Sequence, residues 1–197
     1  MENHSRDEGS RAECWHSFPP QWDAITKARN GLIIEPRKID QLGEAVTALL
    51  ELETFSWIAA GSVREAVSQL ADLPPSLLRD IEDLATRFAE LTGSDYARIR
   101  LEQITTNSCR RMHTDYTDLR LITTYAGPGT QIAFDNDPRS EILLDVPVGY
   151  IGIFKGRRYG ANHKPCYHRS PPAADWGVKR LVLVIDTQVF ASESECE

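Results

Sequence analysis

The spacing of apolar residues changes once along the chain, near Gly93, and this change constrains the fold more than any other feature. Before it, apolar residues recur at every third or fourth position, as on one face of a helix. After it, they alternate with polar residues and turn-forming residues recur, as in short strands. No helical stretch separates these strands, which disfavours parallel pairing. The pattern therefore predicts an α+β fold whose strands form an antiparallel sandwich or jelly roll.

Three helices are predicted in the first part of the chain. The segment "KIDQLGEAVTALLELETF" carries an apolar face that runs from Ile39 to Leu49. The segment "SVREAVSQLADL" opens with Ser62 and Glu65, three positions apart, which is the spacing of a capping box. The segment "PPSLLRDIEDLATRFAELTG" has proline at its start and Gly93 at its end, as helices often do. We expect these helices to form a scaffold.

The expected domain organisation follows from the same pattern. The strand candidates are "ARIRLEQI", "LRLITTY", "TQIAF", "EILLDV", "GYIGIF" and "RLVLVID". We expect a single domain over residues 21–190, with a helical scaffold at about 36–93 and a β core at about 97–190. Residues 1–20 are predicted to be a flexible arm, and residues 191–197 a short acidic tail.

Composition limits the classes of partner. A net charge of −7 in 197 residues argues against nucleic-acid binding, for which a basic surface is expected. No apolar run reaches the length of a membrane span, and the first residues lack the apolar core of a signal peptide. The four cysteines form no Cys-x-x-Cys pair, so a disulfide framework is not expected. These features favour a cytoplasmic protein without a membrane partner.

A candidate metal site begins at His113 and Asp115. In a strand, these two side chains would point to the same face and Thr114 to the other. The motif alone is weak, because a chain of this composition contains His-x-Asp by chance roughly 0.4 times. A third ligand is therefore needed, and His163 and His168 both follow the strand "GYIGIFKG".

Arg180 is the next unusual residue. It opens the strand "RLVLVID" and shares a face with Val182 and Val184. An arginine on an otherwise apolar face inside a sandwich is costly unless it binds an anion, and a carboxylate ligand would be such a partner. The alternative is a surface residue at the start of an edge strand.

The order His-x-Asp, distal His, then Arg resembles the Fe(II)/2-oxoglutarate-dependent dioxygenases. The stretch "HTDYTDLRLITTYAGPGTQIAF" is similar to their prolyl-hydroxylase branch, and so is "PVGYIGIFKG…HRSPP…GVKRLVLVID". The likeness covers roughly residues 97–187. The turn is Gly-Pro-Gly-Thr at 127–130, where the hydroxylases carry Gly-Gly-Glu-Thr. The chain also resembles a bacterial family of uncharacterised proteins that share the GPGT and HRSP stretches.

The resemblance implies a double-stranded β-helix and a facial triad with open positions, the arrangement typical of non-haem Fe(II) oxygenases. His113, Asp115 and His168 would be the iron ligands and the catalytic centre. Arg180 would bind the distal carboxylate of the co-substrate 2-oxoglutarate, and Tyr125 could donate a hydrogen bond to it. Arg120 is a second basic residue beside the site and a second candidate for this carboxylate.

The implied activity is hydroxylation of a small molecule or of a peptide or protein side chain. The sequence does not identify that substrate or the oligomeric state. The basic pairs at 110–111 and 157–158 would favour an anionic substrate if they lie at the rim of the pocket. For Tyr125, packing in the core with its hydroxyl bonded elsewhere is the simpler interpretation.

Two other functions remain open at the level of sequence. Cys109, His113, Cys166 and His168 could form a closed zinc site in a non-redox, metal-handling protein, although their spacing lacks the usual Cys-x2-Cys. A non-catalytic, ligand-binding β-sandwich would be favoured if His113 and His168 lay far apart.

Overall fold

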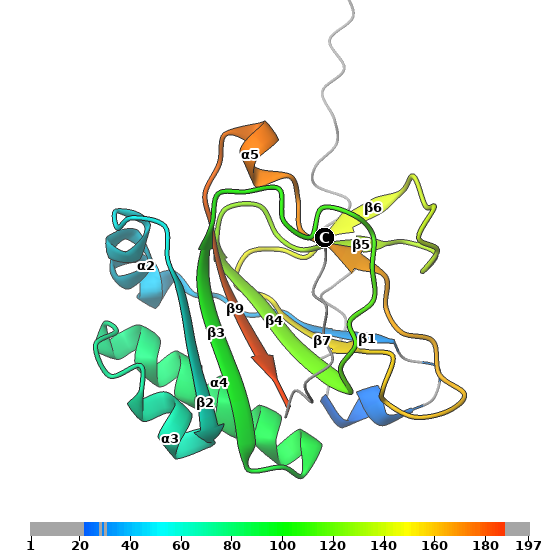
Figure 1. Cartoon of the computed structure of the whole chain (residues 1–197), viewed down its shortest axis with the longest axis horizontal. Helices are drawn as coiled ribbons and strands as arrows, with labels where there is room; N and C mark the ends of the chain where they lie inside the picture. The colour runs from blue at the N-terminus through cyan, green and yellow to red at the C-terminus, as the bar shows by residue number, and fades with distance from the viewer. Residues whose placement is uncertain (1–21, 28, 30, 188–197) are drawn as a thin grey trace, which may run out of the picture.

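The computed structural model describes residues 22–27, 29 and 31–187. The predicted arm at 1–20 and tail at 191–197 lie outside the described residues. Two antiparallel sheets pack against each other, and helices cover the outer face of the larger one (Figure 1). This is the predicted α+β class, with helices that brace a jelly-roll arrangement of strands.

The helical elements, in chain order, are η2 (Trp22–Thr26), η3 (Asp40–Leu42), α2 (Gly43–Leu50), α3 (Val63–Ser68), α4 (Pro75–Thr92) and α5 (Ala173–Trp176). The strands are β1 (Leu32–Glu35), β2 (Ser56–Ser62), β3 (Tyr96–Ile104), β4 (Leu119–Ala126), β5 (Gln131–Ala133), β6 (Leu143–Asp145), β7 (Ile151–Lys155), β8 (His168–Arg169) and β9 (Arg180–Asp186). The larger sheet has the order β1-β7-β4-β9-β3-β2, and the smaller has the order β6-β5-β8. Every strand pair in both sheets is antiparallel.

The helices form where the sequence pattern predicts them, with local signals at their ends. Ser62 and Glu65 make both hydrogen bonds of a capping box at the start of α3. Helix α4 begins with Pro75 and ends at Gly93, whose left-handed backbone has φ 66°. Its apolar stripe is fully buried from Leu77 to Phe88. Burial of each large side chain in such a stripe contributes about 1.5–3 kcal/mol.

The larger sheet has two faces of different character because successive side chains of a strand point to opposite sides. On β9 and β3, one face packs against the helices through Leu181, Leu183, Ile185, Ile99 and Leu101. The other face looks toward the smaller sheet, and on β9 it carries Arg180, Val182, Val184 and Asp186. The second face is therefore the one that can hold a polar site.

The structure corrects the predicted scaffold in one respect. Residues 36–93 are not wholly helical, because Ser56–Ser62 forms strand β2, which pairs with β3 along its whole length. Leu32–Glu35 likewise forms strand β1 and pairs with β7. Both are edge strands of the sheet, and only Ala59 of these two strands is fully buried. Edge strands bury little on either face, so their sequences carry a weak alternation signal.

Among the described residues, no helix combines the length and apolar character that a membrane crossing requires.

Candidate metal centre

Two segments that are far apart in sequence hold the predicted histidines together. His113 lies before β4 and His168 opens β8, and the two form an antiparallel bridge. The backbone N–H of each residue donates to the carbonyl oxygen of the other, at 3.0 Å in both directions. The positions of the two side chains are therefore fixed by main-chain pairing.

The bridge and Asp115 bring three potential metal ligands together. The two imidazole rings have centroids 4.7 Å apart. The Nε2 atom of His168 lies 3.3 Å from Oδ2 of Asp115, and Nε2 of His113 lies 3.9 Å from Oδ1. One ligand atom from each residue falls within 4.8 Å of the others. This spacing suits three ligands of one ion.

Backbone carbonyls set the tautomer of both histidines. Nδ1 of His113 lies 2.9 Å from the carbonyl oxygen of Arg111, and Nδ1 of His168 lies 3.1 Å from that of Cys166. A carbonyl oxygen only accepts, so Nδ1 carries the hydrogen and Nε2 keeps its lone pair. This is the usual outer hydrogen bond of a metal-binding histidine. Burial and the neighbouring His168 lower the pKa of His113, which favours its neutral form.

Asp115 is buried and only half satisfied by protein groups. Arg120 donates through Nη1 to Oδ1 of Asp115. Oδ2 is shielded from solvent and has no hydrogen-bond partner. Burial alone would raise the pKa of Asp115, but the neighbouring imidazole of His168 and the charge of Arg120 outweigh it and hold the pKa far below its ordinary value. An unsatisfied buried carboxylate oxygen costs about 1–3 kcal/mol or more, and a bound cation would remove that cost.

The donor set fits Fe(II). Two imidazole nitrogens and one carboxylate leave positions open for other ligands, as in the facial triad of non-haem iron sites. Arg120 also binds Asp186 in a bidentate pair, with distances of 2.6 and 2.9 Å. The carboxylate of the triad is thus held by an arginine that is itself fixed by a second, fully buried carboxylate.

Arg180 is almost completely buried, with 1% of its surface exposed. Nε donates to the carbonyl oxygen of Pro128 at 2.6 Å and Nη1 to the hydroxyl of Ser170. Nη2 lies 3.4 Å from the hydroxyls of Thr124 and Thr130. Within the described part of the chain, no carboxylate lies within ion-pair distance of this guanidinium. Burial lowers the pKa of Arg180 to about 10.

The Gly-Pro-Gly turn explains how the chain passes so close to Arg180. Gly127 has φ +79°, and a Cβ there would collide with the backbone at Lys179 and Arg180. A Cβ on Gly129 would overlap the carbonyl oxygen of Val146. Both glycines are needed for close backbone approach, and Gly127 is needed for its positive φ as well.

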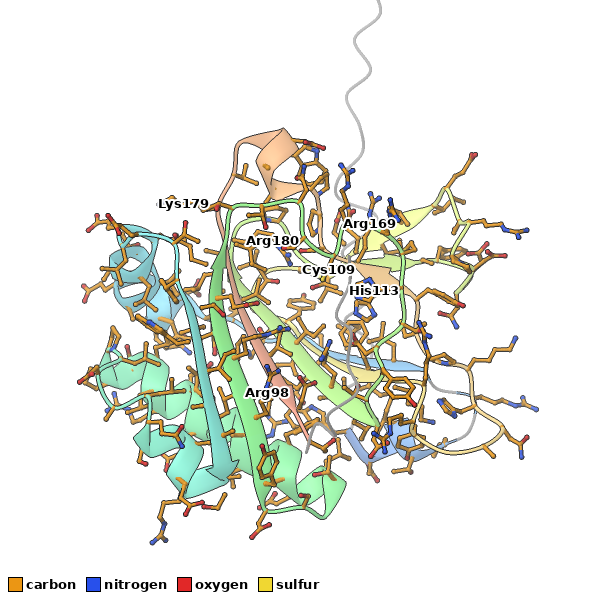
Figure 2. All side chains as sticks on the ribbon, viewed as in Figure 1. Arg98, Cys109, His113, Arg169, Lys179 and Arg180 are labelled. Atoms are coloured by element: carbon orange, nitrogen blue, oxygen red, sulfur yellow. The ribbon has the colours of Figure 1, made fainter. Side chains whose placement is uncertain are left out.

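A cavity of about 690 Å³ joins these groups. The residues of the triad, Arg120 and Arg180 all line it. Figure 2 shows Arg180, Cys109 and His113 toward one end of the larger sheet, beside the smaller sheet, with Arg98 farther along β3. The structure therefore brings five of the six predicted site residues to one space.

Tyr125 is the sixth, and it is not brought to the cavity. It lies on the helix-facing side of β4, where its hydroxyl donates to Asp80 of α4 at 2.6 Å. Burial and the charge of Asp80 raise its pKa well above the ordinary value. The predicted contact with the co-substrate is not compatible with this position, whereas the alternative of core packing is.

The cysteines do not complete a four-ligand zinc site. Among the described residues, the only group of three or more potential ligands is the His-Asp-His triad. Burial and the charge of Asp115 raise the pKa of Cys166 to about 12, which favours the protonated thiol when no metal is bound. Cys109 lines the cavity and is exposed. His163, the other candidate third ligand, is turned to the carbonyl oxygen of Gly156 at 2.8 Å.

Several residues that shape the cavity were not singled out in the sequence. Ser170, Thr124 and Thr130 hold Arg180, and all three stood in stretches that carried the family resemblance without being given a role there. Arg98 and Arg100 line the cavity from β3. Their alternation with buried apolar residues was visible, but the sequence did not show which face of the strand meets the cavity.

Comparison with known proteins places the chain in a family. A sequence model of the family described as "Protein of unknown function (DUF1826)" matches residues 40–186, which is most of the chain. The chain belongs to the DUF1826 family. The match covers the helices α2 to α4, the triad and Arg180. A comparison of this DUF1826 protein with curated sequences gives no match.

Solved structures show what this DUF1826 protein resembles in fold. The rice dioxygenase for auxin oxidation (DAO) aligns with a TM-score of 0.56 at 15% identity, over 83% of this chain and 75% of that one. The 2-oxoglutarate complex of dioxygenase for auxin oxidation 1 from Arabidopsis thaliana gives 0.53 at 13%, over 88% and 89%. A Neurospora crassa protein, truncated at its C-terminus and in apo form, gives 0.52 at 13%, over 85% and 86%.

Structural likeness at such low sequence identity establishes the fold of the protein, but it does not establish the activity or the substrate. The DUF1826 protein has the jelly-roll fold of the Fe(II)/2-oxoglutarate-dependent dioxygenases, which confirms the resemblance inferred from its sequence. Fold alone does not determine activity, because one fold hosts many functions. The chemistry must be argued from the site.

Proposed function

We propose that this protein is a non-haem Fe(II)- and 2-oxoglutarate-dependent oxygenase. The observation that carries the proposal is the convergence of two Nε2 lone pairs and an unsatisfied carboxylate oxygen in a cavity of dioxygenase fold. His113, Asp115 and His168 would hold the iron. The substrate would be a small molecule or a peptide or protein side chain that enters the same cavity.

Arg180 is the better of the two arginines for binding the distal carboxylate of 2-oxoglutarate. Arg120 already binds two carboxylates, those of Asp115 and Asp186. Arg180 is buried among neutral oxygen atoms and has no carboxylate partner among the described residues. A buried guanidinium is stabilised strongly by a bidentate carboxylate. This contrast supports Arg180.

The protein's contribution is binding and orientation. Bound Fe(II) supplies the redox chemistry, in which 2-oxoglutarate is decarboxylated to succinate while oxygen is activated. Arg120 holds the Asp115 carboxylate in its ionised form and in one orientation. The carbonyls of Arg111 and Cys166 keep both imidazoles neutral at Nε2. Apolar side chains between the sheets, such as Ile122, exclude water from one wall of the cavity.

The decisive experiment measures metal and co-substrate binding without air. The wild-type protein should bind about one Fe(II), and addition of 2-oxoglutarate should produce a metal-to-ligand charge-transfer band. Air should then produce succinate slowly, even without substrate. His113→Ala and His168→Ala should abolish metal binding, because each removes one of three ligands.

Asp115→Ala and Cys109→Ser form the control pair. The proposal predicts loss of iron in Asp115→Ala and full iron content in Cys109→Ser. The opposite result would favour the cysteine-containing zinc site. A metal-loaded wild type that gives neither the band nor succinate would refute the oxygenase proposal.

A further inference from the structure

A second pair of arginines faces the cavity from β3, away from Arg180. Strand β3 alternates Ala97, Ile99 and Leu101, which are buried against the helices, with residues that look into the cavity. Arg98 and Arg100 are two successive residues of that inner row, and both line the cavity. Adjacent residues on one face of a strand lie about 7 Å apart, so the two guanidinium groups can reach one ligand.

Both guanidinium groups are largely buried and poorly satisfied. The side chains of Arg98 and Arg100 are only 19% and 22% exposed. Arg98 lies 3.8 Å from Asp186 and Arg100 lies 3.4 Å from Glu102, which is longer than a charge-assisted hydrogen bond. Nε of Arg100 is shielded from solvent and has no hydrogen-bond partner.

The carboxylates near this pair already have other partners. Asp186 accepts two hydrogen bonds from Arg120, and Glu102 accepts one from the hydroxyl of Ser56 at 2.8 Å. The cavity as a whole is lined by six arginines and two acidic residues. This positive excess is local, since the chain carries a net charge of −7. A cavity with such an excess attracts anions.

We propose that Arg98 and Arg100 bind an anionic group of the substrate, either a carboxylate or a phosphate. The inference rests on the proposed oxygenase function, because it assigns the substrate of that same site. Arg98 shares Asp186 with Arg120, and Arg120 holds Asp115 of the triad. An anion at this pair is thus anchored three ionic contacts away from the metal ligand Asp115 (Arg98–Asp186, Asp186–Arg120 and Arg120–Asp115), which leaves the rest of the molecule to reach the iron.

This anion site is distinct from the one at Arg180. In the β3–β9 pairing, Arg180 lies opposite Ile104 and Asp186 lies opposite Arg98. Arg98 is therefore six positions from Arg180 along the strand, roughly 20 Å, and Arg100, opposite Val184, is four positions away, roughly 13 Å. Figure 2 shows the labelled Arg98 and Arg180 at different places along the larger sheet. A co-substrate at Arg180 therefore leaves Arg98 and Arg100 available.

The test uses inorganic phosphate and the full chain without metal, so that it does not depend on turnover. Arg180→Met serves as the background, which removes anion binding at that residue. Binding is followed by phosphorus NMR at constant ionic strength, and each variant's melting temperature checks its folding. In this background, Arg98→Gln and Arg100→Gln should each weaken phosphate binding about tenfold or more, because each removes charge-assisted hydrogen bonds.

Two further variants serve as controls. Arg100→Lys keeps a positive charge and should retain part of the binding, which separates loss of charge from loss of structure. Arg79→Gln removes an exposed arginine of α4 outside the cavity and should change nothing. Acetate is then added as a competitor. Displacement of phosphate at similar concentrations assigns the site to carboxylates, and weak displacement assigns it to phosphates.

The outcomes separate this inference from the oxygenase proposal. Phosphate binding that is absent in the Arg180→Met background, or unaffected by Arg98→Gln and Arg100→Gln, would overturn the anion site, whatever the iron assays give. If the phosphate results are as expected but the wild type forms no succinate, the anion site stands and the oxygenase proposal fails.

Discussion

Replacement of Arg180 by methionine should stabilise the protein when no ligand is bound. Burial lowers the pKa of Arg180 from 12.5 to about 10. Because the folded pKa is depressed, the charged form opposes folding at every pH below about 10, and the penalty disappears only as the pH rises toward 12.5. A shift of this size corresponds to about 3 kcal/mol at neutral pH.

Lost hydrogen bonds offset part of this gain. In Arg180→Met, the carbonyl oxygen of Pro128 and the hydroxyl of Ser170 lose their donor, which costs about 1 kcal/mol for each because both residues are only partly buried. The expected net change is a gain of about 1 kcal/mol, or a melting temperature raised by roughly 2–4 °C. Scanning calorimetry of the metal-free protein measures it.

The same variant should lose its response to 2-oxoglutarate. At a ligand concentration of 100 times Kd, binding stabilises the Fe(II)-loaded wild type by about 2.7 kcal/mol. Loss of the charged pair weakens binding by about 3 kcal/mol, roughly 150-fold, so the same concentration stabilises the variant by less than about 0.5 kcal/mol. Air is excluded during the measurement.

Arg37 provides a matched control. It is also a largely buried arginine, 17% exposed, but it has a carboxylate partner in Asp80 at 2.5 Å. Arg37→Met should lower stability by about 3 kcal/mol, because Asp80 is left without its counter-charge. A fall in melting temperature for Arg180→Met as large as that for Arg37→Met would show that Arg180 is an ordinary structural residue. Our argument for its role would then fail.

Two further predictions concern residues that support the site. Gly129→Ala should destabilise the protein severely, because the added Cβ would overlap the carbonyl oxygen of Val146. Gly43→Ala, at an open helical position, should instead raise the free energy of unfolding by about 0.5–1 kcal/mol. Denaturant unfolding compares the two variants, and equal effects would contradict the argument. Arg120→Met leaves the buried carboxylates of Asp115 and Asp186 without the cation that they share. The free energy of unfolding should therefore fall by about 3–5 kcal/mol, and the affinity for Fe(II) should drop. Denaturant unfolding and metal titration measure the two effects, and wild-type values for both would contradict the role assigned to Arg120.

The three candidate ligands could be predicted from the sequence through the short spacing of His113 and Asp115 and through the family resemblance, which implied His168. His113 and Asp115 are two positions apart, and the distal histidine follows a recognisable strand. Their mutual distance could not be predicted, since it depends on the backbone bridge between segments that are far apart in the chain. The role of Arg120 was equally hidden, because its second partner, Asp186, lies on another strand.

Strand alternation explains the assignment that the structure does not support. Arg120 and Tyr125 stand an odd number of positions apart on β4, so a regular strand sends them to opposite faces. The irregular pairing between Thr124 and Ala126 does not bring Tyr125 back to the cavity. Strands β1 and β2 were missed for a different reason, because edge strands bury too little to show a clear period.

The two rows of side chains on β9 have a consequence for how this chain can change over evolution. Its even-numbered positions carry the ionic and cavity-facing groups from Arg180 to Asp186, and its odd-numbered positions carry the apolar contacts to the helices. A deletion or insertion of one residue within β9 would exchange the two rows, placing guanidinium and carboxylate groups in the apolar layer. Substitutions at the even positions can therefore change the lining of the cavity without disturbing the contacts to the helices. Insertions and deletions of single residues within β9, in contrast, are not tolerated.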